Sequence, residues 1–149
     1  MKKHTVSQQQ SIGDIAENIA ASHLEKQGLS LKTRNFSCRG GEIDLIMTDA
    51  DQLVFIEVRY RSYSNFGSPL ESITVQKQRR IIKAARHYLH QQGLTEVASC
   101  RFDAISIEPA STQSQSQQQQ KPPNKTLKQP FTIEQYTIQW IKNAFNNYA

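Results

Sequence analysis

The sequence contains little cysteine and no long hydrophobic segment. Its two cysteines, Cys38 and Cys100, are too few for a disulfide framework or a four-cysteine zinc site, so we expect reduced thiols. The longest apolar runs, such as residues 53–56, are far too short to span a bilayer. The polar residues that follow Met1 also lack the apolar stretch of a signal peptide. We therefore expect a cytoplasmic protein with no membrane partner.

Two stretches of the chain have almost no apolar residues to bury. Residues 1–10 are polar, and we expect them to form a flexible tail. Residues 110–130 consist mainly of Gln, Ser, Pro and Lys, and such a segment cannot offset the entropy lost on ordering, so we expect it to be disordered. Apolar patterning resumes at Phe131. The sequence therefore predicts a single domain over residues 11–149, interrupted by this insertion at about 110–130.

The charges are balanced in the predicted folded region but unevenly distributed along it. The chain has a formal net charge of +5, yet residues 12–109 contain twelve basic and twelve acidic residues, which sum to zero. Residues 42–57 contain five acids and no Lys or Arg, whereas residues 59–86 contain seven basic residues and one acid. An acidic block followed directly by a basic block is the feature that a functional hypothesis must explain.

Hydrophobic periodicity predicts a mixed α/β domain. A helix is expected over residues 12–27, capped by Ser11 and ended by Gly28, and a second helix from about Thr74 to Gly93 with a basic outer side. Strands are expected at about 29–36, 42–48, 53–60, 99–107 and 133–140, with a short amphipathic tail from Ile141. The order α-β-β-β-α-β-β predicts a small mixed sheet flanked by helices.

The strands over residues 42–48 and 53–60 can form a hairpin that brings acidic residues together. If the loop comprises residues 49–52, or only two residues, the numbers of paired residues sum to 101 and Asp44 lies opposite Glu57. Glu42 then lies opposite Arg59, and all four side chains share one face. A three-residue loop would destroy this arrangement, so the prediction depends on the register.

The opposed carboxylates make a metal site one of two interpretations of this hairpin. Two carboxylates whose Cβ atoms are about 5 Å apart repel each other and destabilise the sheet. A divalent cation reverses that effect, and hard oxygen ligands at this spacing suit Mg²⁺ or Mn²⁺. Such an ion can activate water and neutralise charge on a scissile phosphate, and Arg59 could bind that phosphate. The alternative is a polar outer sheet face that carries acids without a ligand.

Several segments together resemble the YraN family of bacterial proteins, which are regarded as endonuclease-like. The matching segments are Gly13-Asp14-x-Ala16-Glu17, Gly40-Gly41-Glu42-Ile43-Asp44-Leu45-Ile46, Phe55-Ile56-Glu57-Val58-Arg59-Tyr60-Arg61, Phe66-Gly67, Lys77 with the basic helix, Arg101-Phe102-Asp103, and Trp140 to Asn146. The resemblance covers about residues 11–108 and resumes at Trp140. The Gln-rich segment has no counterpart in the family pattern.

That family is in turn similar to the PD-(D/E)XK nuclease superfamily, which includes Holliday-junction resolvases. The resemblance implies a restriction-endonuclease-like αβββαβ core, with Asp44 as the motif aspartate and Glu57-Val58-Arg59 as the (D/E)XK element. It implies that Asp44, Glu57 and the Val58 carbonyl hold Mg²⁺ or Mn²⁺, and that Glu17 matches a helix acid near the metal. Junction resolvases pair their sites, which makes a homodimer plausible by analogy.

The lysine of the (D/E)XK element is replaced by Arg59, and this departure keeps three functions open. Arginine stays protonated and cannot act as a general base, although it can stabilise a phosphate. The first hypothesis is a metal-dependent nuclease with Asp44, Glu57, Arg59 and Glu17 in the active site. The second is a nucleic-acid-binding module without catalysis, and the third is a protein-interaction adaptor.

Nucleic acid is the expected partner, DNA more than RNA, because basic residues follow the acidic hairpin directly. The candidates for phosphate contacts are Arg61, Lys77, Arg80 and Lys83. A solvated helix face is the alternative for the three residues on the second helix. The sequence therefore predicts an acidic site for a cation beside a basic surface for phosphate.

Overall fold

The computed structural model describes residues 11–62, 71, 73–96, 99–110 and 133–146. The expected N-terminal tail (residues 1–10) and residues 111–130 of the expected Gln-rich insertion lie outside the described residues. Within the described part of the chain, no helix is both long enough and apolar enough to cross a membrane.

The described residues form the seven expected elements in the expected order, with one added short helix. The elements are α1 (Ile12–Lys26), β1 (Ser30–Cys38), β2 (Gly41–Asp49), β3 (Gln52–Tyr60), α2 (Val75–Gln91), β4 (Cys100–Pro109), the 3-10 helix η1 (Ile133–Gln135) and β5 (Tyr136–Phe145). Ser11 caps α1 through a capping box with Asp14, as the sequence predicted for that cap. The main correction is β5, because residues 141–145 continue this strand and do not form a separate tail.

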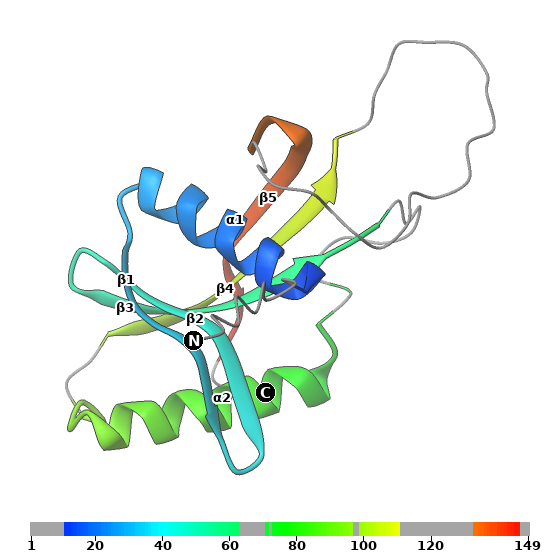
Figure 1. Ribbon diagram of the computed structural model, residues 1–149. Coiled ribbons are helices and arrows are strands. Elements are labelled where there is room, and N and C mark those ends of the chain that lie inside the picture. Colours follow the sequence, from blue (N-terminus) through cyan, green and yellow to red (C-terminus); the bar gives the residue numbers. More distant parts are fainter. Residues whose placement is uncertain (1–10, 63–70, 72, 97–98, 111–132, 147–149) are drawn as a thin grey trace, which may run out of the picture.

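The strands form one mixed sheet in the order β1-β2-β3-β4-β5. Strands β3 and β4 are parallel and are connected through α2, whereas the other neighbouring pairs are antiparallel. Helices α1 and α2 cover opposite faces of this sheet (Figure 1). The predicted mixed sheet flanked by helices is therefore confirmed.

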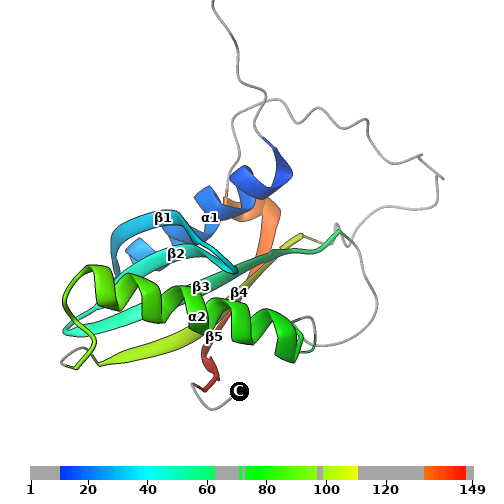
Figure 2. The ribbon, with the colours of Figure 1, turned by 90° about the horizontal axis from the view of Figure 1, so that it is seen from below.

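Each face of the sheet packs its own hydrophobic cluster against one helix. One cluster joins Ile15, Ile19 and Leu24 of α1 to strand residues that include Leu45 and Ile56. The other joins α2 to a different set of strand residues, which includes Ile46 and Phe55. A view from below shows α2 lying across the strands (Figure 2). Alternating strand residues thus feed two cores, as the period of two requires.

The turn between β1 and β2 packs directly against α2. Gly40 has a φ of 97°, which favours glycine, and a Cβ atom on Gly41 would lie only 2.1 Å from the backbone oxygen of Arg80. The side chain of Lys83 lies over Gly40. The Gly-Gly pair therefore lets the hairpin approach the helix backbone, and this contact places β2 beside the first half of α2.

Candidate functional site

The predicted register of β2 and β3 is confirmed, but the ladder ends one residue before the acidic pair. Asp49 pairs with Gln52 across a two-residue loop, and the pairing continues to Leu45 with Ile56, so partner numbers sum to 101. Beyond that point Oδ2 of Asp44 accepts a hydrogen bond of 2.8 Å from the backbone N–H of Val58. The side chain of Asp44 thus takes the place of a backbone partner where the two strands separate.

Glu57 is a nearly inaccessible carboxylate at this point of separation, with a relative exposure of 3%. Its Oε1 lies 3.4 Å from Nζ of Lys77 and 3.6 Å from Nε of Arg59. Its Oε2 is buried and has no N–H or O–H donor among the described residues. One oxygen of Glu57 is therefore paired with cations of the protein, and the other remains available for a ligand.

The two carboxylates perturb each other. Burial and the neighbouring Asp44 raise the pKa of Glu57 to about 7, although Lys77 and Arg59 lower it. Burial likewise raises the pKa of Asp44, against the hydrogen bond from Val58 and the charge of Lys77. A buried acid and a partly buried acid that interact in this way can share a proton or a cation, and such perturbed pairs concentrate at functional sites.

Lys77 lies in the carboxylate site and not with the solvent-facing residues of its helix. It bridges Glu42 at 3.3 Å and Glu57 at 3.4 Å, and its side chain is only 22% exposed. It occupies the first turn of α2, where the helix dipole disfavours a cation. The sequence placed Lys77 among the phosphate contacts. The lysine in a first turn without acids was the signal that could have indicated its acidic neighbours.

The residues of the site could bind a Mg²⁺ or Mn²⁺ ion, but they provide few protein ligands for it. Oδ2 of Asp44 and Oε1 of Glu57 are held by groups of the protein, whereas Oε2 of Glu57 has no donor among the described residues. Magnesium commonly binds through one or two carboxylates and keeps several waters. However, the described residues contain no cluster of three or more His, Cys, Asp or Glu with metal-binding geometry. Any ion would therefore rest on this pair, with backbone or water oxygens completing its shell.

Glu17 lies at the margin of the site. It projects from α1 and is partly buried. Burial raises the pKa of Glu17, a polar interaction with Asn35 of β1 lowers it, and the charge of Asp44 is among the smaller causes that raise it. Glu17 is therefore close enough to Asp44 for the two charges to interact.

The other predicted site residues lie in three different places. Arg59 contacts Glu57 and belongs to the carboxylate site. Arg61 lies elsewhere, because its guanidinium pairs with Glu108 of β4 at 3.8 Å. Arg80 and Lys83 are exposed on α2 beside the β1–β2 turn. The four predicted phosphate contacts therefore do not form one continuous group.

Asp103 is separated from Glu57 by the sheet. It pairs in register with Ile56, whose side chain packs on the α1 side, whereas Glu57 pairs with Ala104 on the α2 side. Asp103 is fully buried and accepts hydrogen bonds from Arg101, Trp140 and the backbone N–H of Asn143. Its role is to join β4 to β5.

The mixed five-stranded sheet, with one helix on each face, defines an α+β protein with a nuclease-like core. The sequence model described as "Uncharacterised protein family UPF0102" matches residues 16–107. The chain therefore belongs to the UPF0102 family, the YraN endonuclease-like group. The matched region includes Glu17, Asp44, Glu57 and Lys77.

Relatives from several bacteria extend this assignment. A UPF0102 protein of Psychromonas ingrahamii is 56% identical over 102 residues, covering 68% of this chain and 82% of its own length. One from Coxiella burnetii strain RSA 331 is 54% identical over 98 residues, covering 66% of this chain and 82% of its own. A relative from Alcanivorax borkumensis is 41% identical over 133 residues, covering 89% and 90% of the two chains.

Proposed function

We propose that this protein is a metal-dependent nuclease that hydrolyses nucleic-acid phosphodiesters, with DNA as the favoured substrate. The observation that carries the proposal is the pairing of the buried Glu57 with the partly buried Asp44 where β2 and β3 separate. The pKa of each is raised, and Oε2 of Glu57 lacks a donor among the described residues. The proposed setting is the cytoplasm, where Cys38 and Cys100, both free thiols in the structure, would stay reduced.

In this proposal Asp44 and Glu57, together with the Val58 carbonyl, hold Mg²⁺ or Mn²⁺. The ion supplies Lewis acidity, which activates water and neutralises charge on the phosphate. The Val58 N–H fixes one oxygen of Asp44, and Lys77 and Arg59 fix one oxygen of Glu57. Both carboxylates are thereby oriented before the ion arrives, which reduces the reorganisation needed for binding.

Arg59 and Lys77 have different parts in this proposal. A guanidinium is a hydrogen-bond donor and not a general base, so Arg59 is proposed to stabilise the negative phosphate and not to remove a proton. Lys77 neutralises part of the charge on Glu42 and Glu57 in the absence of an ion. Glu17 influences Asp44 from the opposite helix and is proposed to help to position the ion or its water.

The test is cleavage of labelled linear and branched DNA, and of RNA, by the purified protein with Mn²⁺. Asp44→Asn and Glu57→Gln should abolish cleavage without loss of folding. Asp51→Asn is the matched control, because Asp51 is an exposed acid in the turn at the other end of the same hairpin. Cleavage that persists unchanged in the Asp44 and Glu57 variants would refute the proposed active site.

The second candidate is a nucleic-acid-binding module on the same fold that lacks turnover. The observation in its favour is that Arg59 stands where the superfamily has lysine, and that two cations of the protein already contact Glu57. This candidate predicts salt-sensitive binding without cleavage in Mn²⁺. It also predicts that Arg59→Lys gains measurable cleavage. If the Arg59→Lys protein binds normally but stays inactive, the absence of this lysine does not by itself explain the lack of turnover.

A further inference from the structure

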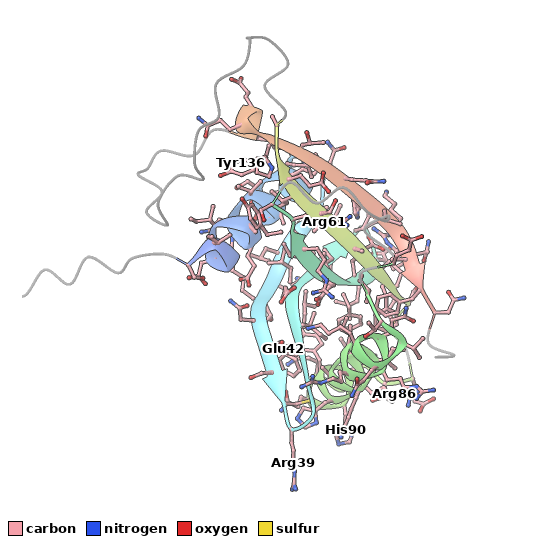
Figure 3. All side chains as sticks on the ribbon, turned by 90° about the vertical axis from the view of Figure 1, so that its right-hand side faces the viewer. Arg39, Glu42, Arg61, Arg86, His90 and Tyr136 are labelled. Carbon is pink, nitrogen blue, oxygen red and sulfur yellow. The ribbon has the colours of Figure 1, made fainter. Side chains whose placement is uncertain are left out.

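The tip of the β1–β2 hairpin and the outer face of α2 form a surface on which positive charge predominates. Arg39 lies in the hairpin turn, and α2 has no acid and four exposed basic residues, Arg79, Arg80, Lys83 and Arg86. The surface, which we call the basic ridge, is formed by Arg39, Arg79, Arg80 and Lys83, and all four are exposed. Figure 3 shows Arg39 at the hairpin tip, at the same end of the molecule as Arg86 and His90 of α2.

The fold brings the cations of the basic ridge together from two elements. The Gly40-Gly41 pair allows the hairpin to contact the backbone of α2 at Arg80, and Lys83 lies over Gly40. Among the described residues, no ion pair involves Arg39, Arg79, Arg80 or Lys83. Like charges gathered without counter-ions repel each other and destabilise the free protein. Binding of a polyanion would relieve this repulsion.

The shape of the basic ridge suits an extended anion. On α2 the exposed residues Arg79, Lys83, Arg86 and His90 recur at helical spacing and form one stripe. At about 1.5 Å per residue this stripe is about 16 Å long, and duplex DNA carries roughly ten phosphate charges over that length. Lys77, two residues before Arg79, lies on a different side of α2 and contacts the carboxylate site, so the same helix contributes to both features.

The burial of the aromatic residues near the basic ridge favours a duplex over a single strand as the ligand. Binding of single strands relies on exposed aromatic rings on which the bases stack. Phe36 is partly buried against Tyr88, with ring centroids 5.2 Å apart, and Tyr88 is itself only 8% exposed. Within the described part of the ridge no Phe, Tyr or Trp is exposed to solvent. The surface therefore offers charge for a backbone and no platform for unpaired bases.

We propose that the basic ridge binds the phosphate backbone of a nucleic-acid duplex, with Arg39 at the hairpin tip as a contact in addition to the residues of α2. This inference rests on the proposed function and names the form of its substrate. Arg61 takes no part, since it pairs with Glu108 away from the ridge.

The experiment is a binding titration by fluorescence anisotropy in EDTA, so that cleavage cannot contribute. The probes are a labelled 30-base-pair DNA duplex and one of its strands alone. The test variant combines Arg39→Gln, Arg80→Gln and Lys83→Gln. The matched control removes the same charge from exposed positions elsewhere, through Lys26→Gln, Lys32→Gln and Lys142→Gln.

We expect the wild-type protein to bind the duplex more tightly than the single strand. Each lost phosphate contact lowers the slope of log K against log salt by about 0.9, so the test variant should lose between two and three units of slope. Its affinity at ~0.1 M salt should fall at least tenfold, while the control variant changes it about twofold or less. A melting curve checks that both variants remain folded.

The inference is overturned if the single strand binds as tightly as the duplex, or if the two triple variants lose equal affinity. The cleavage assay with Mn²⁺, applied to the ridge variant and to Asp44→Asn, distinguishes this result from failure of the proposed function. Duplex binding that depends on the ridge but never leads to cleavage would support the ridge and reject the nuclease. Cleavage that depends on Asp44 without a contribution from the ridge would reject the ridge alone.

Discussion

Glu57→Gln should change the pH dependence of stability more than any exposed substitution. The pKa of Glu57 rises from 4.5 to about 7 on folding, so the folded state holds a proton more tightly than the unfolded state. The resulting stabilisation is complete below pH 4.5 and is lost as the pH rises through 7. At about 1.4 kcal/mol per pKa unit, the loss amounts to about 3 kcal/mol by pH 8. Water screens the charge of Glu57 only weakly, because this side chain is 3% exposed.

The assay is urea denaturation at pH 5 and pH 8 in EDTA, repeated with Mn²⁺. The glutamine side chain cannot ionise, so the variant should match the wild type at pH 5 and exceed its stability by about 3 kcal/mol at pH 8. Mn²⁺ should stabilise the wild type at pH 8 and should not stabilise the variant. Glu25→Gln, at an exposed position on α1, serves as the control. Equal pH dependence in the wild type and the Glu57 variant would refute the reasoning about the buried pair.

Three further substitutions test the fold around the site. Gly41→Ala should cost about 1–3 kcal/mol in thermal or urea unfolding, because its Cβ would lie 2.1 Å from the Arg80 oxygen; Gly13→Ala, whose nearest such contact is 3.6 Å, is the control and should cost less. Asp103→Ala should cost about 3–5 kcal/mol, since it removes the buried carboxylate that pairs with Nε of Arg101. The Asp103 variant also loses the hydrogen bond from Trp140, so its tryptophan fluorescence spectrum should differ from that of the wild type. An unchanged spectrum would contradict this hydrogen bond. Ser11→Ala should cost about 0.5–2 kcal/mol through the α1 cap and leave duplex binding intact, so weakened binding would show that the cap affects the surface.

The fold was predictable because its main signals are local. The apolar periodicity of residues 12–27 and the cap at Ser11 located α1, and period-two alternation located β2 and β3. The short acidic turn determined the register, so the proximity of Asp44 and Glu57 followed from side-chain alternation. The extension of β5 was missed because Ile141 and Phe145 pair with Ala104 and Phe102 of β4 across a register shift, which is a tertiary interaction.

The details of the site were less predictable because they depend on contacts between distant segments. Sequence spacing placed Lys77 on the same helix as Arg80 and Lys83, but only the approach of the hairpin to α2 brings it to Glu42 and Glu57. Similarly, Arg61 follows Arg59 by two residues, yet its partner is on β4. Alternation along a strand indicates which side chains share a face, and it does not indicate what that face contacts.

The unfavourable features of this structure gather at one corner, and this concentration separates the functional hypotheses. Glu57 is buried with a raised pKa, Asp44 lies where the ladder ends, and Lys77 opposes the dipole of its own helix. A structural sheet end would be more stable with apolar residues at these positions, because removing carboxylates from water costs free energy even when they are paired. Locally unfavourable residues of this kind are retained where a functional site requires them. An adaptor that used only its surface would gain nothing from these two acids, whereas the proposed cation site would use both. The raised pKa of Glu57 and of Asp44 therefore supports the proposed cation site more than the adaptor hypothesis.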